Sequence, residues 1–397
     1  MNDVATRARN GFVRAFGGKP AGCWAAPGRI NILGEHTDYN NGFALPCAIG
    51  YYTVAAVAPS SSPTWRVWSE MTDTTVTIGP AGVTSTVEDA DAIDGWAAYV
   101  AGVVWTLKHL AGDQIKGARI AIASDVPIGA GLSSSAALEI AVLTALRDLY
   151  QLDLPVEQQI RAAQSAERDY VGVPSGILDQ TASLLARTDH ALLIDCDTEE
   201  VEQIPLRLRE HDLTMMVIDT GVSHNHVEGE YIDRQNDCAR AAQLLGVDSL
   251  RDVEEHDYID LPDLVLRRRV RHVLTENRRT QMAAAALKQA DDRTFTRLGR
   301  YMYESHLSML MDFEISVQAV DHAVAAARRG GAVGARMTGG GFGGCVIALV
   351  PNDRAEAVRQ EVCRTAEAAD LPEPDFYDGS PAAGAHKLDD PGTANRN

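Results

Sequence analysis

One stretch of the chain, residues 125–137, has the composition of an anion-binding loop. Gly129 and Gly131 allow the backbone to approach a ligand without a Cβ in the way, and three serines at 133–135 stand where an apolar helix should begin. Backbone N–H groups and the positive end of the helix dipole converge at such a point, and phosphate is its usual occupant. An ordinary serine-capped helix start stays open as the alternative.

Two other nucleotide motifs fit this loop less well. A Walker A loop needs a lysine before its serine or threonine, and no lysine occurs between Gly117 and Ala162. A dinucleotide fingerprint needs a third glycine where Ser134 stands, which argues against an NAD-binding protein.

A dense polar cluster follows a short apolar run that contains Arg29. A charge inside an apolar strand is costly unless it is paired. Glu35, His36 and Asp38 supply directional hydrogen-bonding groups within four positions, which suits a polyol ligand. A solvated loop that ends in the Asn-Asn-Gly turn at 40–42 is the alternative interpretation.

Two acidic residues further along the chain could supply one metal ligand and one proton acceptor. Glu167 lies in the helical charge pattern of residues 157–170, where a glutamate normally faces solvent. Asp179 has apolar neighbours at the start of another helix, where an acid also complements the dipole. His224 and His226 form a weaker metal candidate, because no third ligand is evident.

The elements that must position these residues follow from the spacing of apolar residues. Strands are predicted at 30–33, 44–58, 64–69, 118–123, 191–196 and 213–219, and after the five glycines of 339–344. Helices are predicted at 4–17, 96–110, 136–149, 157–170, 228–245, 281–290 and 301–329.

Composition limits the class of protein. A chain of 397 residues suggests two domains or one large one. A net charge of −19 disfavours binding to nucleic acid or to an anionic membrane. Six cysteines without short paired spacing favour the reducing cytoplasm. We find neither a signal-peptide pattern nor the apolar run of ~18 residues that a membrane span needs.

Three motifs together resemble those of the GHMP small-molecule kinases. Residues 28–39, Gly-Arg-Ile-Asn-Ile-Leu-Gly-Glu-His-Thr-Asp-Tyr, look like the galactokinase signature, and residues 127–137 and 337–345 resemble the second and third superfamily motifs. Shorter galactokinase-like stretches occur at 176–180, 229–231 and 305–308. The resemblance covers about the whole chain except its tail. Residues 221–229 depart from the Asn- and Arg-containing stretch that is common before Tyr231.

The resemblance implies an α+β fold of two domains, with mixed sheets and the active site in the cleft between the domains. We expect an N-terminal domain at residues 1–195, carrying the sugar motif and the phosphate loop. A C-terminal domain at residues 196–388 would carry the glycine-rich third motif. Residues 389–397 are expected to form a disordered tail.

The resemblance also assigns roles to individual residues. The sugar would be held by Glu35, His36, Thr37, Asp38, Gly176, Asp179 and Tyr231. The ATP phosphates would be wrapped by Gly129, Ala130, Gly131, Leu132, Ser133, Ser134 and Ser135. Ser69 and Trp96 would line the adenine pocket, and Ser135 and Glu167 would hold Mg²⁺. Asp179 would accept the proton of the anomeric hydroxyl, while Arg29 keeps that carboxylate ionised and stabilises the transferring charge.

These roles imply a galactokinase, which phosphorylates D-galactose at its anomeric hydroxyl with MgATP to give galactose 1-phosphate and ADP, the first step of the Leloir pathway. One alternative is a GHMP kinase for another sugar, such as N-acetylgalactosamine. Another is a non-catalytic galactose and ATP sensor, which the intact Arg29, Ser135, Glu167 and Asp179 disfavour. We expect a cytoplasmic monomer whose partners are galactose and ATP.

Overall fold

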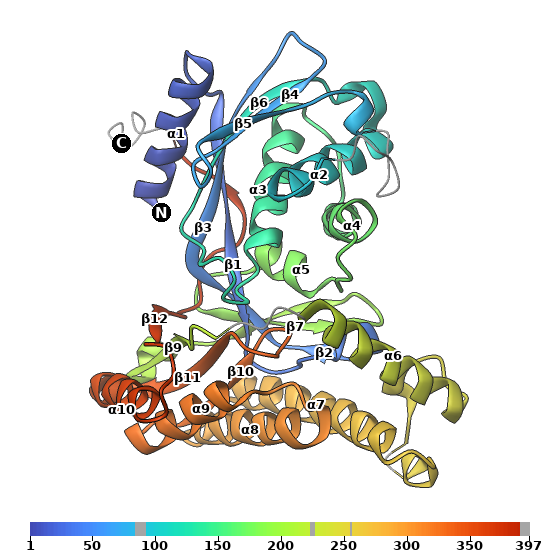
Figure 1. Cartoon of the computed structure of the whole chain (residues 1–397), viewed down its shortest axis with the longest axis vertical. Helices are drawn as coiled ribbons and strands as arrows, with labels where there is room; N and C mark the ends of the chain where they lie inside the picture. Colours follow the sequence, from blue (N-terminus) through green and yellow to red (C-terminus); the bar gives the residue numbers. More distant parts are fainter. Residues whose placement is uncertain (84–92, 223–226, 255, 390–397) are drawn as a thin grey trace.

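The computed structural model describes residues 1–83, 93–222, 227–254 and 256–389 (Figure 1). The predicted metal candidates His224 and His226 lie outside these residues, and so do most of the predicted tail and most of the acidic stretch before Trp96. None of the described helices combines the length and the apolar character that crossing a membrane requires.

The N-terminal half is built on a six-stranded sheet with the strand order β13-β1-β3-β6-β4-β5. Its strands are β1 (Gly22–Asn31), β3 (Pro46–Pro59), β4 (Trp65–Ser69), β5 (Thr74–Ile78), β6 (Ala118–Ser124) and β13 (His386–Lys387). The sheet is mixed, because β4 runs parallel to β6 while the other neighbouring strands are antiparallel. The strand β13 comes from the far end of the chain and pairs with β1.

Helices cover both faces of this sheet (Figure 1). Helix α1 (Asn2–Phe16) lies on one face, and α2 (Trp96–Ala111), α3 (Ser134–Leu149), α4 (Val156–Ser165) and α5 (Leu178–Leu185) lie on the other. All ten residues of β1 are therefore buried, and alternate side chains enter different cores. Cys23 and Ala25 pack in the core beneath α1, whereas Trp24 and Ala26 pack in the core that contains α2 and α3.

The C-terminal half is built on a four-stranded antiparallel sheet with the order β10-β11-β9-β12. Its strands are β9 (Leu213–Asp219), β10 (Gly334–Thr338), β11 (Cys345–Pro351) and β12 (Asp375–Asp378). Its helices are α6 (Val227–Leu245), α7 (Leu264–Gln289), α8 (Thr294–Ser308), α9 (Gln318–Gly330) and α10 (Ala355–Ala368). A small sheet of β2 (Phe43–Ala44), β7 (His190–Asp195) and β8 (Val201–Pro205) lies between the halves (Figure 1).

The predicted elements are largely confirmed, but three predicted helices are wrong in extent. The helix predicted at 281–290 is only the last part of the longer α7. The helix predicted at 157–170 ends at Ser165 and continues as a π-helical turn, η4 (Ala166–Val171). The helix predicted at 301–329 is divided into α8, a second π-helical turn at Met309–Phe313, and α9. The strand β8 was not predicted, and it lies in the charged stretch where the sequence suggested a domain boundary. The division at residue 195 stays a prediction.

Candidate active site

A cavity of about 250 Å³ is lined by residues from both halves of the molecule. Its lining residues are Arg29, Gly34, Glu35, His36, Asp38, Glu167, Val173, Pro174, Ser175, Gly176, Leu178, Asp179, Tyr231, Gly339 and Gly340. Eight of these were singled out from the sequence: Arg29, Glu35, His36, Asp38, Glu167, Gly176, Asp179 and Tyr231. The fold thus gathers residues as far apart in the chain as Arg29 and Gly340 into one small space.

Asp179, in the first turn of α5, is held by two side chains. Arg29 donates from Nε to Oδ1 at 2.7 Å and from Nη2 to Oδ2 at 2.8 Å. The hydroxyl of Ser133 also donates to Oδ2. The remaining guanidinium arm, Nη1, donates to the carbonyl oxygen of Gly131 at 2.7 Å. One guanidinium group therefore fixes both the carboxylate of Asp179 and the phosphate loop, residues 129–135. Arginine is better suited to this use than lysine.

The phosphate loop passes directly into helix α3, as the sequence predicts. Gly129, Gly131 and Ser133 have positive φ angles of 77°, 70° and 58°. Ser133 is the N-cap residue, but its side chain makes no capping hydrogen bond because it faces Asp179 instead. The alternative of an ordinary serine cap is therefore wrong for Ser133, and its hydroxyl leaves the N–H groups at the start of α3 to other acceptors. This geometry suits a phosphate.

His36 is fixed by the protein on both sides of its ring. Its Nδ1 lies 2.6 Å from the hydroxyl of Tyr39, and its Nε2 lies 3.0 Å from the carbonyl oxygen of Gly340. Since a carbonyl oxygen only accepts, Nε2 carries the proton and Nδ1 accepts from Tyr39. Burial lowers the pKa of His36 to about 3, so the ring is neutral at pH 7. Both ring nitrogens are engaged inside the protein.

Glu35 lies beside His36 with its carboxylate anchored from behind. Oε1 accepts from the backbone N–H of Gly339 at 2.6 Å, and Oε2 accepts from the side-chain amide of Asn31. Burial raises the pKa of Glu35, and the nearby guanidinium of Arg336 opposes that effect. The carboxylate is therefore oriented before any ligand enters the cavity.

Asp38 completes the acidic side of the cavity. Burial raises its pKa from the ordinary value of 3.8 to about 6, and the charges of Asp179 and Glu35 act in the same direction. Gly176 lies against it, because a Cβ at position 176 would stand 2.0 Å from Oδ2 of Asp38. Only glycine at position 176 lets this carboxylate keep its place. Tyr231 closes the cavity with its ring centroid 5.0 Å from that of His36.

The predicted magnesium residues Ser135 and Glu167 are adjacent. Glu167 is in the π-helical turn η4 and is only 5% exposed, contrary to the solvent-facing position that a regular helix would favour. It accepts a hydrogen bond from Nε2 of Gln180 at 2.7 Å, and the nearby hydroxyl of Ser135 favours its charged form. Burial raises its pKa, and the charge of Asp179 adds to this effect. A hydroxyl beside a carboxylate suits Mg²⁺ that also binds phosphate oxygens.

This magnesium arrangement differs from a cage made by protein side chains alone. The described residues contain no group of three or more His, Cys, Asp or Glu placed to hold a metal ion. Mg²⁺ in phosphoryl-transfer sites typically takes one or two protein ligands and completes its shell with phosphate and water. The donor set of Ser135 and Glu167 fits that pattern.

Ten of the predicted binding residues do not line the cavity: the seven of the phosphate loop, residues 129–135, and Thr37, Ser69 and Trp96. Thr37 is fully buried, and its hydroxyl lies 2.8 Å from the carbonyl oxygen of Gly34 and 2.9 Å from that of Phe43. It therefore holds the turn rather than facing the cavity. Ser69 ends β4 and Trp96 begins α2, away from the lining residues. The adenine assignment of Ser69 and Trp96 stays a prediction.

The glycines of the third motif were predicted to approach either another element or a ligand, and the structure places them against two elements. A Cβ on Gly339 would stand 3.3 Å from the carbonyl oxygen of Gly131, in the phosphate loop. A Cβ on Gly340 would stand 3.4 Å from the ring of Tyr231. Both glycines also line the cavity, so the run lies against other elements and beside the ligand site.

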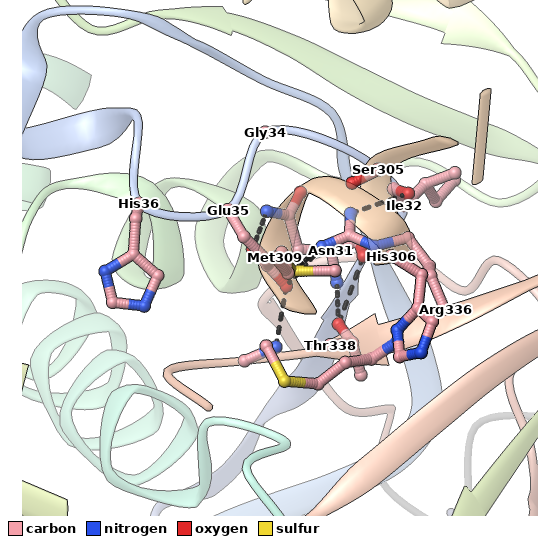
Figure 2. A network of polar contacts seen from close by, with 12 residues as sticks. Asn31, Ile32, Gly34, Glu35, His36, Ser305, His306, Met309, Arg336 and Thr338 are labelled. Carbon is pink, nitrogen blue, oxygen red and sulfur yellow. Dashed lines mark hydrogen bonds and ion pairs between the residues drawn. The ribbon is translucent and has the colours of Figure 1, made fainter. Parts of the chain in front are cut away.

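A network of polar contacts joins the third motif to the sugar motif (Figure 2). The hydroxyl of Thr338 accepts from the backbone N–H of Asn31 at 3.0 Å and lies 3.1 Å from the carbonyl oxygen of Asn31. Arg336 donates from Nη1 to the carbonyl oxygen of Ile32 at 2.9 Å. The sequence analysis did not single out Arg336 or Thr338, because nothing local marks the partner of a buried charge.

Comparison with known proteins matches three family models to this chain. The galactokinase galactose-binding signature matches residues 10–59. The GHMP kinases N terminal domain matches residues 98–187, and the GHMP kinases C terminal domain matches residues 283–368. Together the matches cover the sugar motif, the phosphate loop and the third motif.

Two curated relatives are similar over most of their length. A galactokinase of Streptomyces coelicolor is 42% identical over 385 residues, which cover 95% of this chain and 97% of the relative. A galactokinase of Mycobacterium tuberculosis is 44% identical over 354 residues, which cover 88% of this chain and 95% of the relative.

Solved structures agree with this relationship. The Lactococcus lactis galactokinase complexed with galactose superposes with a TM-score of 0.88 at 31% identity, covering 96% of this chain and 99% of that one. The L. major mevalonate kinase in complex with R-mevalonate has a TM-score of 0.61 at 21% identity, covers 92% of this chain and 99% of that one, and shares the fold alone. With its motifs, its cavity and these relatives in agreement, the chain belongs to the galactokinase family of GHMP kinases.

Proposed function

We propose that this chain transfers the γ-phosphoryl group of MgATP to the anomeric hydroxyl of D-galactose, giving galactose 1-phosphate and ADP. The observation that carries the proposal is the position of Asp179. Its carboxylate lines the sugar cavity and is bound by Arg29, which also holds the phosphate loop through Gly131. A proton acceptor for a sugar hydroxyl thus stands beside the loop that would hold the transferred phosphate.

In the reaction, a carboxylate oxygen of Asp179 accepts the proton of the anomeric hydroxyl. At the same time, the oxygen of that sugar hydroxyl bonds to the γ-phosphorus. The bond between the γ-phosphorus and the bridging oxygen breaks, and ADP leaves with that oxygen. Because this transition state is loose, most of the catalytic effect comes from position and charge neutralisation. Arg29 keeps the carboxylate in place through two hydrogen bonds and adds a positive charge beside the transferring group.

The sugar is held by the acidic side of the cavity. Glu35 and Asp38 accept from sugar hydroxyls, Tyr231 closes the site, and the backbone of Gly176 faces the ligand. Since both nitrogens of His36 are bonded within the protein, we assign His36 a packing contact with the sugar rather than a hydrogen bond from its ring. Thr37 supports the turn from inside.

The nucleotide is held by the loop that starts α3. Backbone N–H groups of residues 129–135 would face the ATP phosphates, where the helix dipole favours negative charge. Ser135 and Glu167 would hold Mg²⁺, which neutralises phosphate charge when bound. Ser69 and Trp96 keep their proposed place beside the adenine.

We propose a monomer located in the cytoplasm. The cytoplasm is supported by the cysteines, since no disulfide links any two of the six, all of which are described. Gel filtration with light scattering would test the first point.

The proposed reaction is tested by following ADP release and sugar phosphate formation together. Purified chain with galactose and MgATP should release one ADP for each galactose 1-phosphate, which phosphorus NMR identifies by its anomeric phosphate. Binding of galactose and ATP without turnover would show the sensor alternative and overturn the proposal. Release of ADP only when N-acetylgalactosamine replaces galactose would assign the other kinase alternative.

A further inference from the structure

We propose that Arg336 and Glu276, both outside the cavity, are positioning residues that set galactose recognition. Together they form a buried ionic support beneath the sugar turn, residues 34–36, and hold it from the C-terminal half of the molecule. The inference rests on the proposed function. It adds two residues that line no part of the cavity and lie outside the three motifs at 28–39, 127–137 and 337–345.

Arg336 lies in β10 and is completely buried. Its Nη1 donates to the carbonyl oxygen of Ile32 at 2.9 Å, just before the turn. Its Nη2 lies 3.4 Å from Oε1 of Glu35, and its Nη1 lies 3.8 Å from Oε1 of Glu276 (Figure 2 shows Arg336 beside Glu35). The guanidinium therefore contacts both the backbone of Ile32, just before the turn, and the carboxylate of Glu35 within it.

Glu276 lies in α7 and is also completely buried. Its Oε1 accepts from the backbone N–H of Gly34 at 2.9 Å and from the hydroxyl of Ser305 at 2.7 Å. Its Oε2 accepts from Nε of Arg279 at 2.8 Å. Burial would raise the pKa of Glu276, but Arg279 and Arg336 outweigh it and lower the pKa to about 2. The group is thus a permanent anion that binds the turn's backbone.

A third contact completes the support. His272, one helical turn before Glu276, lies with Nε2 3.1 Å from the carbonyl oxygen of Glu35 and with Nδ1 2.9 Å from the hydroxyl of Ser308. A carbonyl oxygen accepts, so Nε2 donates. The backbone N–H of Gly34, the backbone carbonyl of Glu35 and the carboxylate of Glu35 are each bound by a different residue of the C-terminal half.

This arrangement has an energetic cost that stability alone does not explain. Buried ion pairs are often no more stabilising than apolar residues of similar volume, because desolvation offsets their attraction. Here the charges instead fix a carboxylate whose direction decides which sugar hydroxyl it meets. A displacement of about 1 Å in such a group is enough to weaken recognition.

The support contacts the sugar turn. The phosphate loop is held elsewhere, by Arg29 at its Gly131 and by the hydrogen bond from its Ser133 to Asp179. The two binding functions should therefore separate in kinetics. Loss of the support should change the KM for galactose and the discrimination between galactose and its 4-epimer glucose. The KM for MgATP should stay nearly constant.

The decisive variant is Arg336→Lys, which keeps the charge but cannot span Ile32, Glu35 and Glu276 with one ammonium group. We expect the KM for galactose to rise about tenfold and the galactose-to-glucose ratio of kcat/KM to fall about fivefold or more, as the loss of one charged hydrogen bond implies. The KM for MgATP should change less than about threefold, because the phosphate loop keeps its own supports.

Arg269→Lys is the matched control. Arg269 is equally buried, at 2% exposed, and binds Asp237, Glu314 and the carbonyl oxygen of Asp312, none of which lines the cavity. It should lose thermal stability to a similar degree while its galactose KM and sugar ratio stay at the wild-type values. Equal kinetic effects in the two variants would overturn the proposal, since they would reflect lost stability only.

Ser305→Ala is the milder second variant, for use if Arg336→Lys does not fold. It removes one hydroxyl that donates to Glu276 and leaves every charge in place. We expect the galactose KM to rise about threefold with an unchanged KM for MgATP, because Glu276 keeps its hydrogen bonds to Gly34 and Arg279. An unchanged galactose KM in every folded variant contradicts the proposal. If the wild-type chain phosphorylates no sugar, the proposed function fails. The role of Arg336 is then tested by comparing the galactose affinities of the wild-type chain and Arg336→Lys in calorimetry.

Discussion

The carboxylate of Asp179, the proposed proton acceptor, is held in place by its neighbours before any ligand binds. Its two oxygens receive three hydrogen bonds, two from Arg29 and one from Ser133. The pairing of Arg29 with Asp179 could be predicted, because a charge in an apolar strand needs a partner. The contact from Ser133 could not, because a serine at a helix start is expected to cap that helix. Both contacts orient the carboxylate without substrate.

We expect Asp179→Asn to lower kcat by ~10²–10⁴-fold or more, because the amide cannot accept the hydroxyl proton. Galactose binding, measured by calorimetry, should stay within about tenfold of the wild-type affinity, since the amide keeps the size of the side chain. The matched control is Asp195→Asn, which alters an aspartate that also pairs with an arginine, Arg251, but outside the cavity. Activity in Asp179→Asn above a few per cent of wild type would remove Asp179 from this role.

Asp38 should give galactose binding a pH dependence. Burial raises its pKa to about 6, and the charges of Asp179 and Glu35 add to the effect. Asp38 is therefore mainly ionised above pH 6 and mainly protonated below it. The galactose KM should therefore increase as the pH falls through about 6, as Asp38 loses its charge and an acceptor oxygen. Kinetics over about pH 5 to 8 measure this change. A wild-type profile as flat as that of Asp38→Asn would contradict the assignment.

The same shift has a defined consequence for folding. Between the ordinary pKa of 3.8 and the raised value of about 6, the unfolded chain releases the proton of Asp38 while the folded chain keeps it. The contribution of this group to the free energy of unfolding therefore falls as the pH rises through that window. Asp38→Asn should remove that part of the pH dependence in urea titrations.

Two features of the helices place Ser135 and Glu167, the proposed magnesium ligands. Helix α3 starts at Ser134 immediately after the positive-φ loop, so Ser135 lies in its first turn. The π-helical turn η4 turns Glu167 into the interior, where it meets Ser135. The helix could be predicted from apolar spacing, but the π turn could not, because it changes the direction of side chains without a local sequence signal.

We expect Glu167→Ala to raise the Mg²⁺ concentration needed for half-maximal activity by about tenfold or more, because one of few protein ligands is removed. A Mg²⁺ titration at fixed ATP and saturating galactose measures this, and Mn²⁺ as a second cation checks that the loss is one of metal binding. The control is Glu157→Ala, an exposed glutamate on α4 that should leave the titration unchanged. Identical titrations for Glu167→Ala and wild type would exclude Glu167 as a ligand.

The whole molecule shows what sequence patterns leave undetermined. Long, strongly periodic elements such as α2, α3, β6 and β9 could be predicted, and the family motifs predicted most of the cavity lining. Short strands such as β8 and β13 could not. The two-residue β13 has no period and depends on its distant partner β1, and the five-residue β8 pairs with β7 but lies in a charged stretch. The ionic support of Arg336 and Glu276 was missed for the same reason, since burial in the fold alone reveals it.

We expect the acidic cavity to select galactose, and the sugar specificity of the enzyme tests this selection. The measurement is kcat/KM for D-galactose, D-glucose and N-acetylgalactosamine at saturating MgATP. Inverting the 4-hydroxyl leaves a buried partner such as Glu35 or Asp38 unpaired, at a cost of roughly 1–3 kcal/mol. Glucose should therefore be poorer than galactose by roughly 10- to 150-fold or more. Comparable values for glucose and galactose, or a higher value for N-acetylgalactosamine, would contradict the account.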